Sequence, residues 1–151
     1  NWARVMAQIV YYVIATDLLT GPINVCVPSG NFGNVFSGWI ARRMGAPIDQ
    51  LIVAANANDI LERFFNHNDM STAPVVPSLS PSMDIQVSSN FERLLFEMNG
   101  RDGGLTAEQL QRFRTSGSLS VEADQWAEFI EGKFQAARLD DSETLAVISQ
   151  T

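Results

Sequence analysis

The segment Pro28-Ser29-Gly30-Asn31-Phe32-Gly33-Asn34 combines the residue types best suited to chemistry in this sequence. Its two glycines let the backbone approach a ligand closely and let several N–H groups turn toward a common point. Those donors and the start of a following helix make an anion site that needs no cationic side chain. Ser29, Asn31 and Asn34 add short polar side chains that can complete a phosphate cradle. The alternative is a strand-to-helix turn that needs glycine for steric reasons alone.

The same segment lacks the signatures of two common nucleotide sites. No Lys-Ser or Lys-Thr pair follows Gly33, so the segment is not a P-loop. The G-x-G-x-x-G spacing of dinucleotide-binding folds is also absent.

Other reactive side chains favour structural interpretations. His67 falls at an expected helix end, where it suits the helix dipole. Lys133, the only lysine, falls on the polar side of a helix expected from Trp126 to Phe134. Cys26 lies in an apolar run and is expected to be a small buried residue. Arg4 is expected in the first turn of an apolar helix, where the helix dipole makes a cation mildly unfavourable. Its presence there indicates either a bound anion or solvent exposure.

The elements that must position the turn alternate along the first part of the chain. Hydrophobic periodicity and turn residues predict helices over 1–20, 35–44 and 57–66, with strands at 23–27 and 51–55. This alternation is typical of an α/β fold with an open parallel sheet. We therefore expect three portions within 1–151: an α/β unit over 1–70, a Ser- and Pro-rich loop over 71–88, and a mostly helical part over 89–151.

The helical part carries further local signals. Capping boxes are expected at Ser89–Glu92, Thr106–Gln109 and Asp140–Glu143, and a short strand at 118–121.

Composition excludes several classes of protein. The 151 residues suit one domain, and 46% hydrophobic residues can bury a core. With 17 acidic and 10 basic residues the chain has no footprint for nucleic acid or an anionic membrane surface. The longest apolar stretch, Ile9–Thr16, is too short to span a bilayer. One cysteine and one histidine form neither an intramolecular disulfide nor a Cys/His zinc site, so we expect a cytoplasmic protein without a metal.

Four motifs, in this order, resemble threonine synthases, which are pyridoxal-phosphate enzymes of the tryptophan-synthase-β-like fold. The resemblance covers nearly the whole chain, and the last motif is the most specific. The matching segments are Asn1-Trp2-Ala3-Arg4, Pro28–Asn34, Ala55-Asn56-Ala57-Asn58-Asp59-Ile60-Leu61 and Ser80–Arg93.

The resemblance implies roles for particular residues. In this family the glycine-rich turn holds the phosphate of pyridoxal phosphate, which here implies Ser29, Gly30, Asn31, Phe32, Gly33 and Asn34. Arg4 and Asn1 match the segment that lies by the phosphate of the substrate, O-phosphohomoserine. The family reaction releases that phosphate and adds water to give threonine, as part of threonine biosynthesis.

Two family segments are missing from this sequence. The lysine that holds the cofactor as a Schiff base precedes this region in the family, and a His-containing segment follows it. We therefore expect a central fragment of a longer enzyme that contributes no catalytic residue and is not catalytically competent alone. Apolar surfaces exposed by truncation are expected to cause self-association.

Two alternatives remain open at this point. The first is a threonine-synthase-like lyase or dehydratase that acts on another phosphorylated amino acid. The second is a non-catalytic α/β module that binds a phosphate-bearing ligand or a partner protein.

Overall fold

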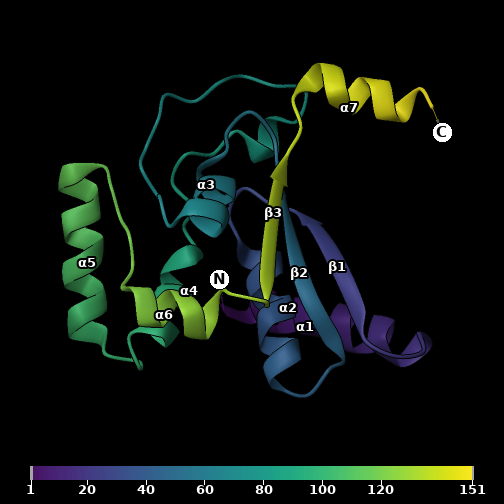
Figure 1. Ribbon diagram of the computed structural model, residues 1–151, viewed down its shortest axis with the longest axis horizontal. Helices are drawn as coiled ribbons and strands as arrows, with labels where there is room; N and C mark the ends of the chain where they lie inside the picture. Colours follow the sequence, from purple (N-terminus) through teal and green to yellow (C-terminus); the bar gives the residue numbers. More distant parts are fainter. Residues whose placement is uncertain (1, 151) are drawn as a thin grey trace.

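Three parallel strands form the centre of the structure, with β2 between β1 and β3 (Figure 1). The computed structural model describes residues 2–150. Its elements, in chain order, are α1 (Trp2–Leu18), β1 (Ile23–Pro28), α2 (Gly33–Arg43), β2 (Ile48–Ala55), α3 (Ile60–His67), the short 3₁₀ helix η1 (Pro81–Met83), α4 (Phe91–Met98), α5 (Gly103–Ser116), α6 (Ala123–Phe129), β3 (Phe134–Arg138) and α7 (Asp141–Ile148). The predicted α/β class with a parallel sheet and a mostly helical second half is confirmed.

The third strand replaces the end of a predicted helix. The spacing of Trp126, Phe129 and Phe134 predicted one helix through Phe134, but α6 ends at Phe129. Gly132 then adopts a φ of +68°, a conformation that ends a helix readily because glycine has no Cβ. The chain leaves this turn as β3 and pairs Phe134 with Leu51 of β2. The prediction was wrong because strand pairing with a distant segment overrode the local pattern.

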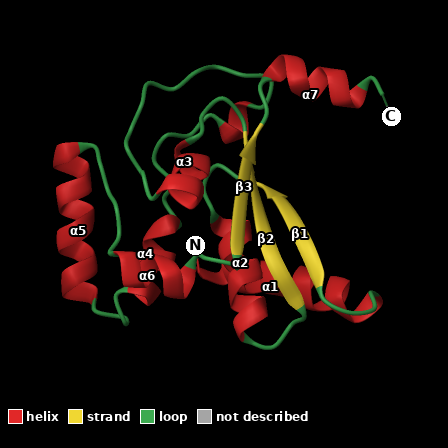
Figure 2. Cartoon of the chain, viewed as in Figure 1, coloured by secondary structure: helices red, strands yellow, loops and turns green. Residues whose placement is uncertain are grey.

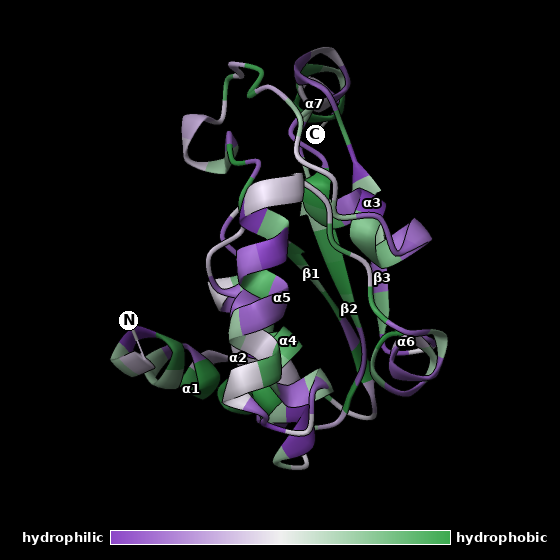
Figure 3. Cartoon of the chain, turned by 90° about the vertical axis from the view of Figure 1, so that its left-hand side faces the viewer, coloured by the Kyte–Doolittle hydropathy of each residue, from purple (hydrophilic) through white to green (hydrophobic). Residues whose placement is uncertain are grey.

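Burial alternates along the strands, and helices α2 and α3 cover the more buried face of the sheet. On that face Leu51 and Val53 of β2 and Val27 of β1 are buried, and α2 and α3 pack there. The strands β1 and β2 are hydrophobic along most of their length (Figure 3). The opposite face carries Cys26, which is exposed and does not follow the prediction of a buried residue. Cys26 precedes buried Val27 in the strand, and successive side chains point to opposite faces.

Helix α1 reaches the sheet through α2. Tyr12 and Val5 of α1 are buried against α2, and Gly38 of α2 makes this close approach possible. A Cβ atom at Gly38 would lie 2.7 Å from the Tyr12 ring and 2.8 Å from Leu51 Cδ2. Because both neighbours are packed side chains, the site has no room for a larger residue. The other faces of α1 remain exposed and largely apolar.

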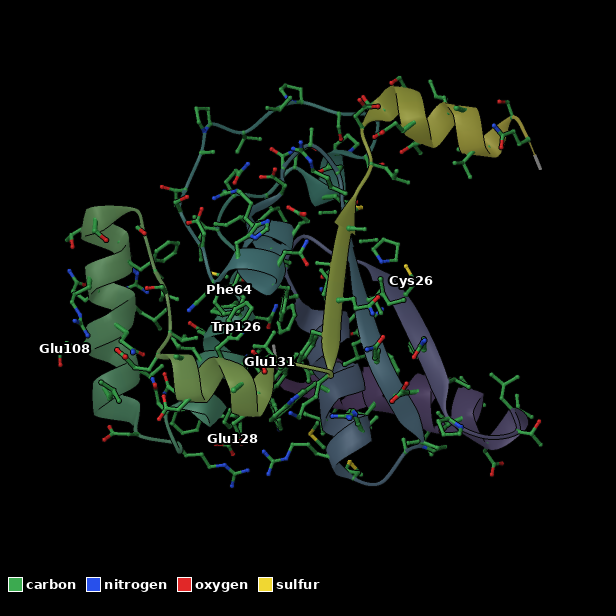
Figure 4. All side chains as sticks on the ribbon, viewed as in Figure 1. Cys26, Phe64, Glu108, Trp126, Glu128 and Glu131 are labelled. Carbon is green, nitrogen blue, oxygen red and sulfur yellow. The ribbon has the colours of Figure 1, made fainter. Side chains whose placement is uncertain are left out.

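An aromatic cluster fills the space between the sheet, α3 and α6. Phe64 lies 4.6 Å from Phe91 and 5.3 Å from Trp126, measured between ring centroids. Figure 4 shows the Phe64 and Trp126 rings one above the other between α3 and α6. Edge-to-face aromatic contacts of this kind stabilise beyond the area they bury. The cluster continues to Phe32 at the start of α2, where the candidate site lies.

Two of the three predicted capping boxes are wrong. Asp140 and Glu143 form the predicted box at α7. Helix α5 instead begins at Gly103 with Asp102 as its cap, so Thr106 lies inside the helix. Before α4, the Ser89 hydroxyl donates a hydrogen bond to Asn31 Oδ1 instead, and no side chain caps the helix. Residues 118–121 form no strand, although Leu119 and Met70 exchange two backbone hydrogen bonds.

Candidate functional site

The turn between β1 and α2 is held in shape by its own serine. The backbone N–H of Ser29 donates to Ala54 O at 3.0 Å, which continues the sheet. The Ser29 Oγ then accepts from the N–H of Phe32 at 3.0 Å. Phe32 has a φ of +62°, in the left-handed region that disfavours a residue with a Cβ. Because the Phe32 ring is fully buried in the aromatic cluster, packing stabilises this strained backbone.

Five backbone N–H groups of the turn have no acceptor among the residues that the structure describes. Phe32 in the left-handed conformation precedes the right-handed start of α2, and such a sequence of conformations forms an anion-binding nest. Helix α2 has no acidic residue in its first turn and no side-chain cap. Within residues 2–150, no acceptor is bound by the N–H groups of Gly30, Asn31, Gly33, Asn34 and Val35. Unpaired donors at a helix N-terminus fit a phosphate group.

Both glycines of the turn lie against a second segment, residues 78–90, which we call the strap. A Cβ atom on Gly30 would lie 2.9 Å from Ile85 Cδ1 and 3.2 Å from Met83 Cα. A Cβ on Gly33 would lie 3.2 Å from Asn90 Nδ2. The glycines therefore serve steric packing as well as the exposure of N–H groups. The two interpretations of the turn are compatible, because the strap packs on the glycines while the donors remain unpaired.

The polar side chains predicted to complete the cradle have structural partners. The Tyr12 hydroxyl donates to Asn34 O at 3.0 Å and to Asn34 Oδ1 at 2.9 Å. Burial raises the pKa of the Tyr12 phenol far above its ordinary value, so this donor stays protonated. The Ser89 hydroxyl contacts Asn31 Oδ1 at 3.2 Å, and Asn90 donates to Asn31 O. Sequence reasoning missed Tyr12, although a phenol in an apolar helix signals a polar partner.

A carboxylate clamp fixes the strap at the carboxyl end of β2. Asp84 accepts from Asn56 Nδ2 at 2.7 Å, from Ser78 Oγ at 2.6 Å and from the Ser78 N–H at 2.9 Å. Asn58 Nδ2 adds a longer contact to Asp84 at 3.1 Å. The Asn58 side chain also pairs with the backbone of Val76. Asn56 and Asn58 therefore hold the long loop at the carboxyl end of β2. Figure 2 shows the long connections between α3 and α4 as loop.

The clamp predicts a loss of stability in acid. The Ser78 hydroxyl, followed by the Ser78 N–H and Asn56, lowers the pKa of Asp84 below its ordinary value. A lowered pKa in the folded state means that the stabilisation is complete above the unfolded value of about 3.9. It is lost as the pH falls below that value and through the folded one. Urea midpoints measured from pH 6 to pH 3 should therefore fall less in Asp84→Asn than in the unaltered chain. Equal pH slopes in the two proteins would contradict the clamp.

The remaining candidates lie at several places. Arg4 is exposed on the first turn of α1 and forms no ion pair with any residue in the described range, while Asn1 lies outside that range. His67 is the last residue of α3, as expected. Lys133 lies in the turn before β3, where its Nζ donates to Glu128 O. Neither His67 nor Lys133 belongs to the β1–α2 turn.

A cavity of about 640 Å³ opens between α1, α2, α4 and α5, apart from the glycine-rich turn. Its lining is mostly apolar and includes Trp39, with Arg43 stacked 5.0 Å over that ring. Arg93 stacks 5.5 Å over Trp2 at the same cavity. No residue from Ser29 to Asn34 lines it. The cavity therefore contributes nothing to the phosphate cradle.

Two further structural findings concern residues 2–150 as a whole. No helix in this range combines the length and hydropathy that crossing a bilayer requires. Nor does the range contain three His, Cys, Asp or Glu side chains gathered closely enough to hold a metal ion.

Comparisons with known proteins identify relatives over almost the whole chain. No family model matches it. The threonine synthase of Pseudomonas aeruginosa is 51% identical over 153 residues, which cover 99% of this chain and 32% of the relative. The crystal structure of threonine synthase from Brucella melitensis with bound pyridoxal phosphate matches 99% of this chain and 33% of its own, with a TM-score of 0.91 and 43% identity. The yeast threonine synthase structure matches with a TM-score of 0.90 and 36% identity, over 99% of this chain and 32% of its own.

The chain spans about a third of the length of the relatives it matches. The likeness holds for both sequence and fold across that third. The resemblance noted in the four motifs is therefore confirmed: this chain is homologous, along its length, to one third of a threonine synthase.

Proposed function

We propose that this chain forms the cofactor-phosphate site of a threonine synthase, an enzyme that converts O-phospho-L-homoserine and water to L-threonine and phosphate. The observation that carries the proposal is a set of N–H groups at the start of α2 that have no acceptor within residues 2–150: those of Gly30, Asn31, Gly33, Asn34 and Val35. The homology to threonine synthases supports the cofactor assignment, because a matching structure contains pyridoxal phosphate. The proposal includes a role in threonine biosynthesis.

The residues of this chain bind and orient the phosphate of the cofactor. The donors of the turn supply hydrogen bonds, and the N-terminus of α2 supplies favourable dipole charge. Ser29 fixes the turn through the N–H of Phe32, and Tyr12 fixes Asn34. Pyridoxal phosphate, when bound, supplies an electron sink for carbanion chemistry. Arg4 and Asn1 are proposed to contact the phosphate of the substrate, as in the family motif.

Location and substrate belong to the same proposal. A single cysteine, Cys26, forms no intramolecular disulfide, which supports a cytoplasmic protein. The substrate assignment rests on the homology to threonine synthases.

A titration with pyridoxal phosphate tests the cradle in this chain. We expect saturable, non-covalent binding, detected by cofactor absorbance, and competition by inorganic phosphate. Borohydride reduction should leave no covalent adduct on Lys133, the only lysine, because it lies away from the turn and donates to the Glu128 carbonyl. Absence of any binding would contradict the proposed cofactor site, and a stoichiometric Lys133 adduct would contradict the assigned geometry.

An assay of the intact enzyme tests the reaction. The protein that contains this sequence together with the rest of a threonine synthase should release phosphate and threonine in equal amounts from O-phosphohomoserine. Phosphate release without threonine would favour a related lyase instead.

A further inference from the structure

The strap holds two buried side-chain oxygens that have no hydrogen-bond partner within residues 2–150. Gln86 is 6% exposed and Ser88 is 7% exposed. Among the described residues, no hydrogen bond reaches Gln86 Oε1 or Ser88 Oγ. A buried polar atom without a partner costs free energy, because it has lost water and gained nothing. Such atoms require an explanation, and a role in binding a ligand is one.

Both side chains lie beside the glycine-rich turn. Ile85, immediately before Gln86, packs on Gly30. Ser89, immediately after Ser88, contacts Asn31 Oδ1 at 3.2 Å, and Asn90 Nδ2 donates to Asn31 O at 3.0 Å. The strap therefore crosses the turn between two points of contact, and the unpartnered side chains lie between those points.

The burial pattern directs both side chains inward. Val87, between them, is 59% exposed, whereas Gln86 and Ser88 are buried. Alternation of this kind places residues 86 and 88 on the side of the strap that faces the protein and residue 87 on the solvent side. The unpartnered oxygens and the unpaired N–H groups of the turn thus belong to one region of the structure.

We propose that Ser88 and Gln86 are further ligand-binding residues of the phosphate cradle. This inference rests on the proposed function. The Ser88 hydroxyl donates to an oxygen of a phosphate monoester, which offers only acceptors when doubly ionised. The Gln86 carboxamide oxygen accepts from an N–H or O–H group of the same ligand. The turn supplies backbone donors from one side, and the strap supplies side chains from the other.

The Asp84 clamp holds the strap in place for this role. Asp84 lies two residues before Gln86 and is bound by Asn56 and Ser78 at the carboxyl end of β2. The two side chains are therefore positioned before a ligand arrives, which lowers the entropic cost of binding.

Ser88→Ala separates a ligand-binding role from a structural one. The Ser88 hydroxyl makes no hydrogen bond within residues 2–150, so its removal should leave the thermal midpoint unchanged or raise it. The same change should weaken binding of pyridoxal phosphate about tenfold, as expected for one hydrogen bond to a charged group. Gln86→Met, a change of similar volume, should weaken binding without lowering the midpoint.

Two control variants and two ligands complete the experiment. Ser82→Ala, at an exposed serine of the same strap, should change neither the thermal midpoint nor the affinity for pyridoxal phosphate. Ser78→Ala should lower the thermal midpoint, because it removes the hydroxyl that donates to Asp84. Equal weakening for inorganic phosphate and pyridoxal phosphate assigns the Ser88 contact to the phosphate group. Weakening for pyridoxal phosphate alone would place the contact on the rest of the ligand and would contradict the proposed contact between Ser88 and the phosphate.

The outcomes distinguish this inference from the proposed function. If the unaltered chain and Ser88→Ala bind pyridoxal phosphate equally well, the inference is wrong and the proposed function stands. A lower thermal midpoint for Ser88→Ala without ligand also overturns it, since the hydroxyl then has a structural partner. If the unaltered chain binds neither ligand, both the proposed function and the inference fail.

Discussion

Phe32→Ala should abolish measurable binding of pyridoxal phosphate and lower the free energy of unfolding by about 3–5 kcal/mol. The Phe32 ring is fully buried and lies 5.5 Å from Phe65 and 6.0 Å from Phe91 between centroids. Its removal leaves a cavity in the aromatic cluster. Phe32 also precedes α2 in the left-handed conformation. Without the packing of its ring, the backbone of the turn is no longer held in that conformation. The stability loss is a large fraction of the 5–15 kcal/mol typical of a folded domain.

Two other variants separate packing from backbone strain at this position. Glycine adopts a positive φ without strain, so Phe32→Gly should be roughly 1 kcal/mol less destabilising than Phe32→Ala. Phe65→Ala empties the same cluster from α3, so it should lose similar stability but retain binding. Urea unfolding and absorbance titration measure the two quantities. If Phe65→Ala loses binding as fully as Phe32→Ala, the cluster acts through global stability and not through the turn.

We propose, as a second large effect, that the exposed face of α1 causes the chain to self-associate. Val5 to Thr16 contains no charged side chain, so the net charge of −7 opposes contact at this face only weakly. The exposed apolar residues of this helix are Trp2, Met6, Val10, Tyr11, Val13, Ile14 and Leu18. Apolar surface of this extent on a helix drives association when nothing covers it.

Charged substitutions on that face should return the chain to a monomer. The double variant Val10→Glu with Ile14→Glu removes two half-exposed apolar side chains and should weaken association at least about 100-fold. Leu139→Glu with Leu145→Glu adds the same charge outside α1 and should leave association unchanged. Sedimentation velocity over a range of concentrations measures both variants. If the unaltered chain sediments as a monomer at high concentration, the proposal is contradicted.

Local sequence was sufficient to predict the turn and its neighbours. A β-branched run followed by Gly30, Gly33 and a helical pattern involves only residues that are near in the chain. The structure confirms β1, α2, β2 and the helix on either side of them, with changes of a few residues at their ends. Homology then added a candidate cofactor, because one matching threonine synthase structure contains pyridoxal phosphate.

Contacts between distant segments could not be predicted in the same way. The strap meets the turn across more than 50 residues, through Asn31 and Ser89, and Asp84 joins Asn56 across 28 residues. These contacts depend on how the long loop folds back over the sheet. The third strand also depends on distant pairing, because Phe134 pairs with Leu51 although its local spacing is helical.

The sequence by itself determined where the backbone donors of this protein lie, because glycine spacing and a helix start are local properties of the chain. Tertiary structure alone decided which polar side chains share the site with them. Tyr12 and Asp84 acquire their partners only when distant segments of the chain fold together. Burial in the same fold leaves Gln86 Oε1 and Ser88 Oγ without a hydrogen-bond partner within residues 2–150. Burial is a property of the folded molecule, and it determines which polar atoms lose their contact with water.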